Sequence, residues 1–166
     1  MHVLFVDDNH VWQKIALKEF PKIGCTVAIA GDGQQALNYL SSSPAICPRP
    51  DIVLMDIAMP VMDGLEATRI IRTQVPFSTD PKLCSTPIVG LCITSLRVDR
   101  ERFIAQGMDD IILKPWKTPQ MQRVLQWWSQ RLLLPRIEGK SFPRAPIAPA
   151  WGARTGQSYR GPRSRI

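Results

Sequence analysis

Short runs of apolar residues alternate along most of the chain with longer stretches in which apolar residues recur every three or four positions. The short runs carry few polar interruptions, which is typical of parallel strands buried on both faces. Turn residues, mainly Gly, Pro and Asp, separate the two kinds of segment. We predict strands at 3–6, 25–30, 51–55, 88–91 and 110–113.

The longer stretches read as amphipathic helices. The last of them begins with Thr118 as N-cap and Pro119 at the first helical position, and Pro135 ends it. Two polar segments rich in Ser and Pro read as surface loops, at 41–50 and 75–86. We predict helices at 11–20, from 33 through Leu40, at 64–73, at 98–106 and at 119–134.

Five strands alternating with five helices predict an α/β fold with a doubly wound, five-stranded parallel sheet. Ligands of such sheets bind at the carboxyl ends of the strands. Asp7 and Asp8 follow the first strand, Asp56 follows the third, and Lys114 follows the fifth. We therefore expect these four side chains to meet at one edge of the sheet.

Three carboxylates crowded together repel one another and require a cation. The set offers only oxygen ligands, without His or Cys, and this chemistry favours Mg²⁺. Each feature alone has a plain structural explanation, such as a helix N-cap for Asp7 and Asp8 or a turn for Asp56. Their order along the chain, each at a strand end, favours a site.

Composition divides the 166 residues into one domain, 1–134, and a tail, 135–166. The domain is near neutral, with 14 Lys and Arg against 13 Asp and Glu, whereas the tail has 7 against one. We interpret the Pro- and Arg-rich tail as disordered. Weak contacts with phosphate backbones or anionic lipid, and an unnatural end from a shifted reading frame, are alternatives.

Other classes of protein are disfavoured by the sequence. No run of about 18 apolar residues predicts a membrane span, and no basic region precedes the first apolar segment, so we expect no signal peptide. The four Cys form no C-x-x-C pair, which indicates a reduced, cytoplasmic chain. No helix-turn-helix follows the domain, so we expect no DNA-binding domain.

The motifs together resemble the receiver domain of two-component response regulators, over roughly residues 2 to 134, in the style of receivers of hybrid histidine kinases. This resemblance implies the flavodoxin-like (βα)5 receiver fold. The segments that carry it are Val3–Asp8, Asp51–Gly64, Met59–Arg69, Pro87–Leu91, Gly107–Asp110 and Ile111–Pro115.

The resemblance implies phosphorelay signalling with Asp56 as phosphoacceptor. The phosphoryl group would come from a histidine kinase or a histidine phosphotransfer protein. Asp7, Asp8, Asp56 and the carbonyl of Ala58 would hold Mg²⁺, and Lys114 would contact the phosphoryl group. The chain would be no enzyme beyond catalysing its own phosphorylation and dephosphorylation.

Three positions depart from the family pattern. Cys92 stands where the family has a phosphoryl-binding Thr or Ser, and Ile93 follows it where a small residue is usual. A thiol is a weaker donor than a hydroxyl. Ile111 stands where the family has an aromatic residue. In the family, this aromatic residue and the Thr or Ser together form the switch. The alternative function is therefore a pseudo-receiver, an interaction module with a disabled switch.

Two further alternatives are weaker. An acid-nucleophile phosphatase on a similar sheet would need a second Asp where this chain has Ala58. A redox role for Cys92 competes with its simpler explanation as a small residue at a strand end. Among the tryptophans we expect Trp116 at the surface and at least one of Trp127 and Trp128 in the core.

Overall fold

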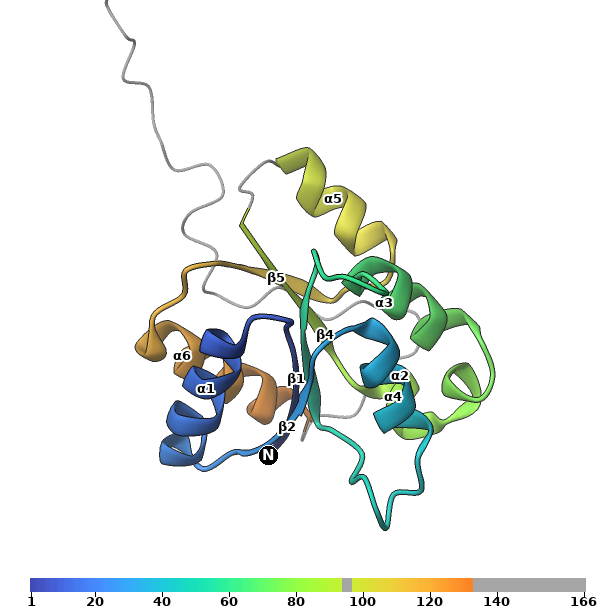
Figure 1. Ribbon diagram of the computed structural model, residues 1–166, viewed down its shortest axis with the longest axis horizontal. Coiled ribbons are helices and arrows are strands. Elements are labelled where there is room, and N and C mark those ends of the chain that lie inside the picture. The colour runs from blue at the N-terminus through green and yellow to red at the C-terminus, as the bar shows by residue number, and fades with distance from the viewer. Residues whose placement is uncertain (94–96, 133–166) are drawn as a thin grey trace, which may run out of the picture.

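The computed structural model describes residues 1–93 and 97–132, which form a parallel sheet flanked by helices on both faces (Figure 1). The strand order is β2-β1-β3-β4-β5, so the chain starts in the middle of the sheet and winds outward in both directions. The predicted doubly wound, flavodoxin-like fold is confirmed. The strands are β1 (His2–Val6), β2 (Thr26–Ala30), β3 (Ile52–Asp56), β4 (Ile88–Cys92) and β5 (Asp110–Leu113).

The helices form two layers, with α1 and α6 on one face of the sheet and α2, α3 and α5 on the other (Figure 1). Two 3-10 turns, η1 (Pro21–Ile23) and η2 (Phe77–Thr79), complete the described elements. The helices are α1 (His10–Glu19), α2 (Gly33–Ser41), α3 (Gly64–Thr73), α4 (Pro81–Ser85), α5 (Arg97–Ala105) and α6 (Thr118–Leu132).

The sheet buries both of its faces, and side chains along each strand therefore alternate between two cores. Val3 and Phe5 of β1 pack with α1 and α6, whereas Leu4 and Val6 pack with α2 and α3. All five residues of β3 are buried. This double burial is the physical reason for uninterrupted apolar runs, and it holds the strand ends that carry the acidic residues rigidly in place.

Most predicted boundaries agree with the structure to within one or two residues. Strand β5 and helix α3 match their predicted ranges, β3 extends one residue further to include Asp56, and α6 already includes Thr118. The predicted helix end at Pro135, the tail and the domain boundary lie outside the described residues. Within the described residues, no helix is long and apolar enough to cross a membrane.

The prediction of a plain surface loop at 75–86 is wrong. This segment contains η2 and α4, and it buries Phe77 and Leu83 against the core on the α3 side. Asp80 caps α4 by accepting hydrogen bonds from two backbone amides. The polar composition hid these two apolar anchors, because a single buried residue per turn leaves no periodic pattern.

The expectation of a surface-exposed Trp116 is also wrong. Its side chain is 5% exposed and packs against Phe5, Phe20 and Trp12. The fold brings the α1 side of the molecule over it, which the local sequence around Trp116 does not reveal. Trp128 is fully buried, as expected for one of the α6 pair.

Candidate functional site

Asp7, Asp8 and Asp56 come together at the carboxyl edge of the sheet, as the sequence predicted. Oxygens of the three carboxylates all lie within 4.8 Å of one another. Asp7 directly follows β1 and is fully buried, Asp56 ends β3 and is 8% exposed, and Asp8 is exposed. The pairing of β1 with β3 in parallel register brings the two strand ends together.

Lys114 completes the cluster from the end of β5. Its Nζ donates a hydrogen bond to Asp56 Oδ2 at 2.7 Å and forms an ion pair with Asp7 Oδ2 at 2.6 Å. The Lys114 amide donates to the Cys92 carbonyl at 2.7 Å, which fixes the end of β5 against the end of β4. One ammonium therefore lies between two of the three carboxylates.

The turn after β1 is held by two polar side chains that surround Asp7. The side-chain oxygen of Asn9 caps α1 by accepting a hydrogen bond from the Val11 backbone amide. The backbone amide of Asn9 donates to Asp7 Oδ1 at 3.0 Å. Gln13 Nε2 donates to the Asp7 carbonyl at 2.7 Å. These bonds leave Asp8 projecting toward solvent beside the buried pair.

The turn after β3 meets the start of α3 at Gly64, where a side chain would collide with the backbone carbonyl of Asp56. The Gly64 amide donates to the Ile57 carbonyl at 3.0 Å, and Thr68 donates to the Gly64 carbonyl at 2.7 Å. Within this turn, between Ile57 and Gly64, Val61 adopts φ 68° and exposes 86% of its side chain. A β-branched residue in this left-handed region is strained, so the surrounding turn imposes the conformation.

Burial raises the pKa of the Asp56 carboxyl above its ordinary value. The negative charge of Asp7 adds to the rise, whereas the hydrogen bond and charge of Lys114 oppose it. The folded state therefore binds a proton at Asp56 more tightly than the unfolded chain does. The free energy of unfolding therefore falls as the pH rises from the ordinary pKa of Asp to the raised pKa of Asp56, because Asp56 ionises over this range.

Replacing Asp56 by Asn should therefore stabilise the protein at pH 7 when no divalent cation is present. Asn keeps the shape of the side chain and removes the buried charge, while Lys114 keeps its ion pair with Asp7. Urea unfolding at pH 7 and pH 4 measures the effect. The gain should shrink at pH 4, because the raised pKa of Asp56 lets the folded wild type bind a proton there more readily than the unfolded chain does. A less stable Asn variant at pH 7 would contradict this account.

The three carboxylates fit a hard divalent cation such as Mg²⁺. They offer only oxygens, and the exposed position of Asp8 leaves one side open to the water that this ion retains. Lys114 already brings one positive charge to Asp7 and Asp56, which supports a requirement for cations here. Ala58 lies in the turn directly after β3 and is exposed.

The three departures from the family pattern lie in different environments. Cys92 ends β4 and is 5% exposed, and Ile111 on β5 is buried in the core on the α3 side. Ile93 follows Cys92 and exposes 85% of its side chain, so it lies at the rim of this edge. Whether Ile93 narrows the space for a phosphoryl group stays a prediction.

Sequence analysis missed two arginines that hold α3 and α5 against residues at the start of β5, at the edge of the sheet opposite Asp56. Arg72 of α3 binds Asp109 and three backbone carbonyls. Arg100 of α5 forms a buried ion pair with Asp110 at 2.8 Å, and both side chains are less than a tenth exposed. In the sequence, neither arginine can be distinguished from an ordinary exposed residue of a helix.

Comparison with known proteins agrees with this geometry. The family described as response regulator receiver domain matches residues 3–126. "Two-component system protein A" of Emericella nidulans is 40% identical over 128 residues, which cover 76% of this chain and 17% of that protein. "Hybrid signal transduction histidine kinase I" of Dictyostelium discoideum is 35% identical over 113 residues, covering 68% of this chain and 6% of that protein.

A solved structure shares both the fold and the sequence pattern. The receiver domain of the sensor histidine kinase PA1611 from Pseudomonas aeruginosa, with a magnesium ion coordinated in its active site cleft, is 35% identical. The match has a TM-score of 0.64 and covers 76% of this chain and 95% of that one. The chain spans less than a fifth of the two curated relatives, and therefore corresponds to one of their domains. It belongs to the response regulator receiver domain family of two-component signal transduction.

Proposed function

We propose that this receiver accepts a phosphoryl group on Asp56 in a Mg²⁺-dependent reaction. The donor would be the phosphohistidine of a histidine kinase or a histidine phosphotransfer protein. The observation that carries the proposal is the placement of Asp56, at a rigid strand end within 4.8 Å of two other carboxylates and 2.7 Å from Lys114. Phosphoryl transfer depends mainly on such positioning and on charge stabilisation.

In the proposed reaction, an oxygen of the ionised Asp56 attacks phosphorus. The new O–P bond forms as the N–P bond of the phosphohistidine breaks, and its electron pair stays on the imidazole. Asp56 gives up no proton, because it reacts as the carboxylate. Its neighbours orient it, since Lys114 holds Oδ2 and β3 fixes the backbone.

Lys114 would act both before and after phosphoryl transfer. It now neutralises Asp56 and Asp7, and after transfer its ammonium would bind the phosphoryl oxygens while Asp7 remains its partner. Asp7, Asp8, Asp56 and, by family resemblance, the carbonyl of Ala58 would hold Mg²⁺. The bound ion would supply positive charge that stabilises the phosphoryl oxygens.

The chain would then catalyse only its own phosphorylation and dephosphorylation, in the cytoplasm. The pseudo-receiver alternative differs in output, because Cys92 and Ile111 replace the residues that normally couple phosphorylation to the surface. Both residues are buried, so neither contacts a partner directly in this conformation. Phosphorylation without any change in partner binding would favour that alternative.

Asp56 should be the single site of modification when the protein is treated with a small phosphodonor and Mg²⁺. Intact mass spectrometry should find one phosphoryl group on the wild type and none on Asp56→Asn. Asp63→Asn is the matched control, because Asp63 is an exposed carboxylate at the end of the turn between β3 and α3. An adduct of full stoichiometry on Asp56→Asn would overturn the proposal.

Mg²⁺ should bind in the millimolar range, because Mg²⁺ sites that rely on a few carboxylates keep much of their hydration. Asp8→Ala should weaken binding by about tenfold or more, since one of the three ligand charges is lost. Asp8 is exposed, so the fold should tolerate the change. Isothermal calorimetry decides, with Asp63→Asn as control, and unchanged affinity in Asp8→Ala would exclude this ligand set.

A further inference from the structure

The helices α1 and α6 lie side by side on one face of the sheet and carry a strong excess of positive charge (Figure 1). Residues 10–23 and 117–132 contain six Lys and Arg but a single acid, Glu19. The other residues of 1–134 contain 8 Lys and Arg against 12 Asp and Glu. The molecule is therefore divided into a basic layer and an acidic remainder. The six residues of the basic layer are Lys14, Lys18, Lys22, Lys117, Arg123 and Arg131.

The basic layer lacks the acidic partners that Lys and Arg have elsewhere in the fold. Within residues 1–93 and 97–132, Lys22 alone among the six forms an ion pair, with Glu19 at 2.7 Å. Arg131 instead lies over the Trp127 ring, 3.9 Å from its centroid. Five basic residues outside the layer each pair with an aspartate, namely Arg49, Arg72, Lys82, Arg100 and Lys114.

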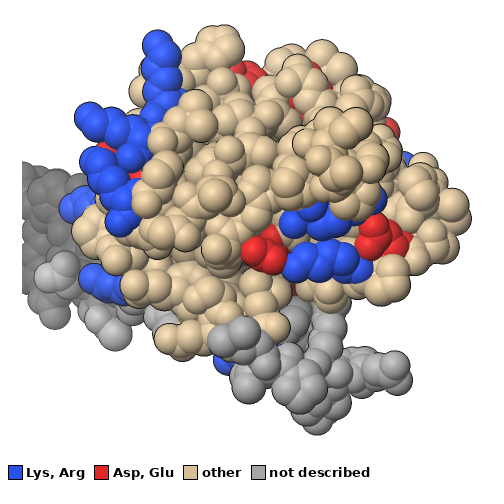
Figure 2. Space-filling model, turned by 90° about the horizontal axis from the view of Figure 1, so that it is seen from below, with Lys and Arg blue, Asp and Glu red and all other residues tan. Residues whose placement is uncertain are grey.

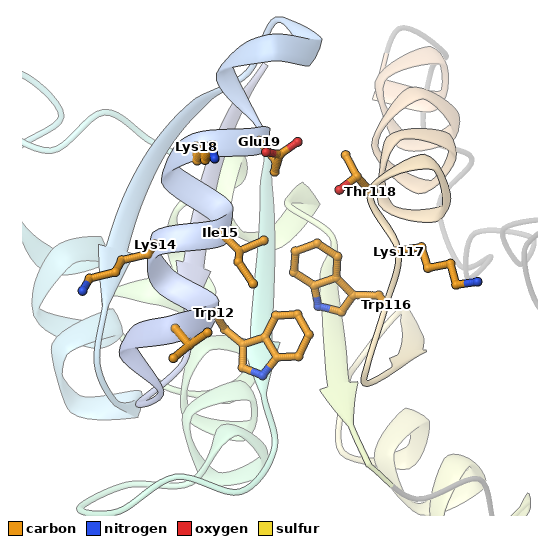
Figure 3. Close-up of a pocket in the computed structure, with 9 residues that line it drawn as sticks. Trp12, Lys14, Ile15, Lys18, Glu19, Trp116, Lys117 and Thr118 are labelled. Atoms are coloured by element: carbon orange, nitrogen blue, oxygen red, sulfur yellow. The ribbon is translucent and has the colours of Figure 1, made fainter.

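The lysines of α1 are arranged so that they repel one another. Lys14 and Lys18 are exposed and lie four positions apart, which makes them neighbours on one helix face, and like charges at this spacing destabilise a helix. Lys14 and Lys117 point outward on the two sides of the layer (Figure 3). Figure 2 shows Lys and Arg gathered where α1 lies, with little acidic surface among them. An extended anion across the layer would relieve this repulsion.

The segment that follows α6 continues the same charge. Residues 135–166 carry 7 Lys and Arg against one acid, and α6 ends at Leu132. Six of these seven are Arg, whose planar guanidinium binds phosphate oxygens with two hydrogen bonds at once. Two basic parts of the chain are therefore joined directly, and a long polyanion can neutralise both.

We propose that the outer face of α1 and α6, together with the basic residues of 135–166, binds nucleic acid through its phosphate backbone, without reading its sequence. A duplex carries one negative charge per about 1.7 Å of its axis, so it neutralises several Lys and Arg at once and releases condensed counterions. The proposal goes beyond phosphoryl transfer, because no group of the carboxylate site takes part in this contact.

An anionic membrane also offers negative charge, but the basic layer has no apolar stripe to insert into it. The exposed large apolar residues on the described part of the layer are Val11, at 64%, and Leu17, at 51%. They are six positions apart and therefore lie about 120° apart around α1, with Lys14 and Lys18 between them. A membrane is for this reason an outcome of the test rather than the proposal.

The probe is a fluorescein-labelled duplex DNA of about 20 base pairs, titrated with the full chain and followed by fluorescence anisotropy at several salt concentrations. Lys14→Gln with Lys18→Gln is the test variant for α1, and Arg123→Gln tests α6. Arg69→Gln with Arg102→Gln is the control, because it removes the same charge at exposed positions on α3 and α5. Vesicles of phosphatidylcholine with phosphatidylserine are the lipid probe, and their binding is measured by sedimentation.

We expect binding that is equal for unrelated sequences and weakens about a hundredfold or more between about 50 and 200 mM salt. The lysine pair should weaken it about tenfold or more and reduce the slope of log affinity against log salt by about 1.8, since each phosphate contact contributes about 0.9. Arg123→Gln should weaken it about fivefold, and the control pair less than about threefold.

Three results would overturn the proposal. One is the absence of binding to the duplex, and another is tighter binding to the vesicles than to the duplex. The third is an equal loss of affinity in the lysine pair and the control pair, because net charge rather than the basic layer would then explain the binding.

The lysine pair should be phosphorylated by a small phosphodonor as the wild type is, and Asp56→Asn should bind the duplex as the wild type does. A failure of phosphorylation and a failure of nucleic-acid binding are therefore separate results. All substituted Lys and Arg side chains are exposed, and thermal unfolding followed by circular dichroism verifies that each variant remains folded before affinities are compared.

Discussion

Gly64→Ala should destabilise the protein by about 3 kcal/mol and also impair phosphorylation of Asp56. A Cβ at this position would lie 2.0 Å from the backbone carbonyl oxygen of Asp56 and 2.8 Å from the Met55 side chain. Backbone cannot give way as a flexible side chain does, so α3 must move away from the end of β3 or Asp56 must shift. Either movement displaces the proposed nucleophile from Lys114.

Urea unfolding and intact mass after phosphodonor treatment measure the two effects of Gly64→Ala. Gly31→Ala is the matched control, because a Cβ there would meet only the flexible side chain of Gln35, at 3.3 Å. The control should lose less than about 1 kcal/mol and keep full phosphorylation. If Gly64→Ala behaved like Gly31→Ala, the close approach of α3 to the site would be wrong.

Arg72→Ala should cost about 3 kcal/mol or more of stability while leaving the chemistry of Asp56 intact at low temperature. The guanidinium donates to the carbonyls of Leu83, Thr86 and Gly107 and pairs with Asp109 Oδ2 at 2.7 Å. Its side chain is 18% exposed and that of Asp109 is 12% exposed. Removal would leave a largely buried carboxylate and three carbonyls without this donor.

The effect of Arg72→Ala should appear as a lower midpoint of urea unfolding. Phosphorylation at 4 °C should be retained, because Asp109 also accepts from the Ile88 amide and these groups lie at the amino ends of β4 and β5, away from Asp56. Arg69→Ala, on the same helix but exposed, should change stability by less than about 0.5 kcal/mol. Equal stability of the two variants would show that the Arg72 contacts contribute nothing.

The sequence by itself determined the sheet and the edge at which its polar residues meet. Strands buried on both faces leave uninterrupted apolar runs, and all strands of a parallel sheet end at the same edge. The acids after β1 and β3 and the lysine after β5 therefore had to converge, whatever the details of packing. The predicted α3 and β5 matched because Gly and Pro mark their ends clearly.

Only the tertiary structure decided which side chains are buried where local pattern is silent. Trp116 lies in an irregular connection, and its burial results from contact with Phe5, Phe20 and Trp12, all distant along the chain. The segment 75–86 is anchored by Phe77 and Leu83 in the same way. Contacts of this kind depend on how layers stack, which periodicity within one segment does not encode.

The same limit applies to charged residues. Arg72 and Arg100 look like ordinary solvent-exposed helix residues in the sequence, yet both are bound to aspartates near β5. Burial of a charge becomes favourable only when a partner from another element reaches it. The residues of the site could be predicted from the sequence, because each of them lies at the end of a predicted strand. The network that holds the surrounding helices was decided by the assembled fold, because its partners meet only there.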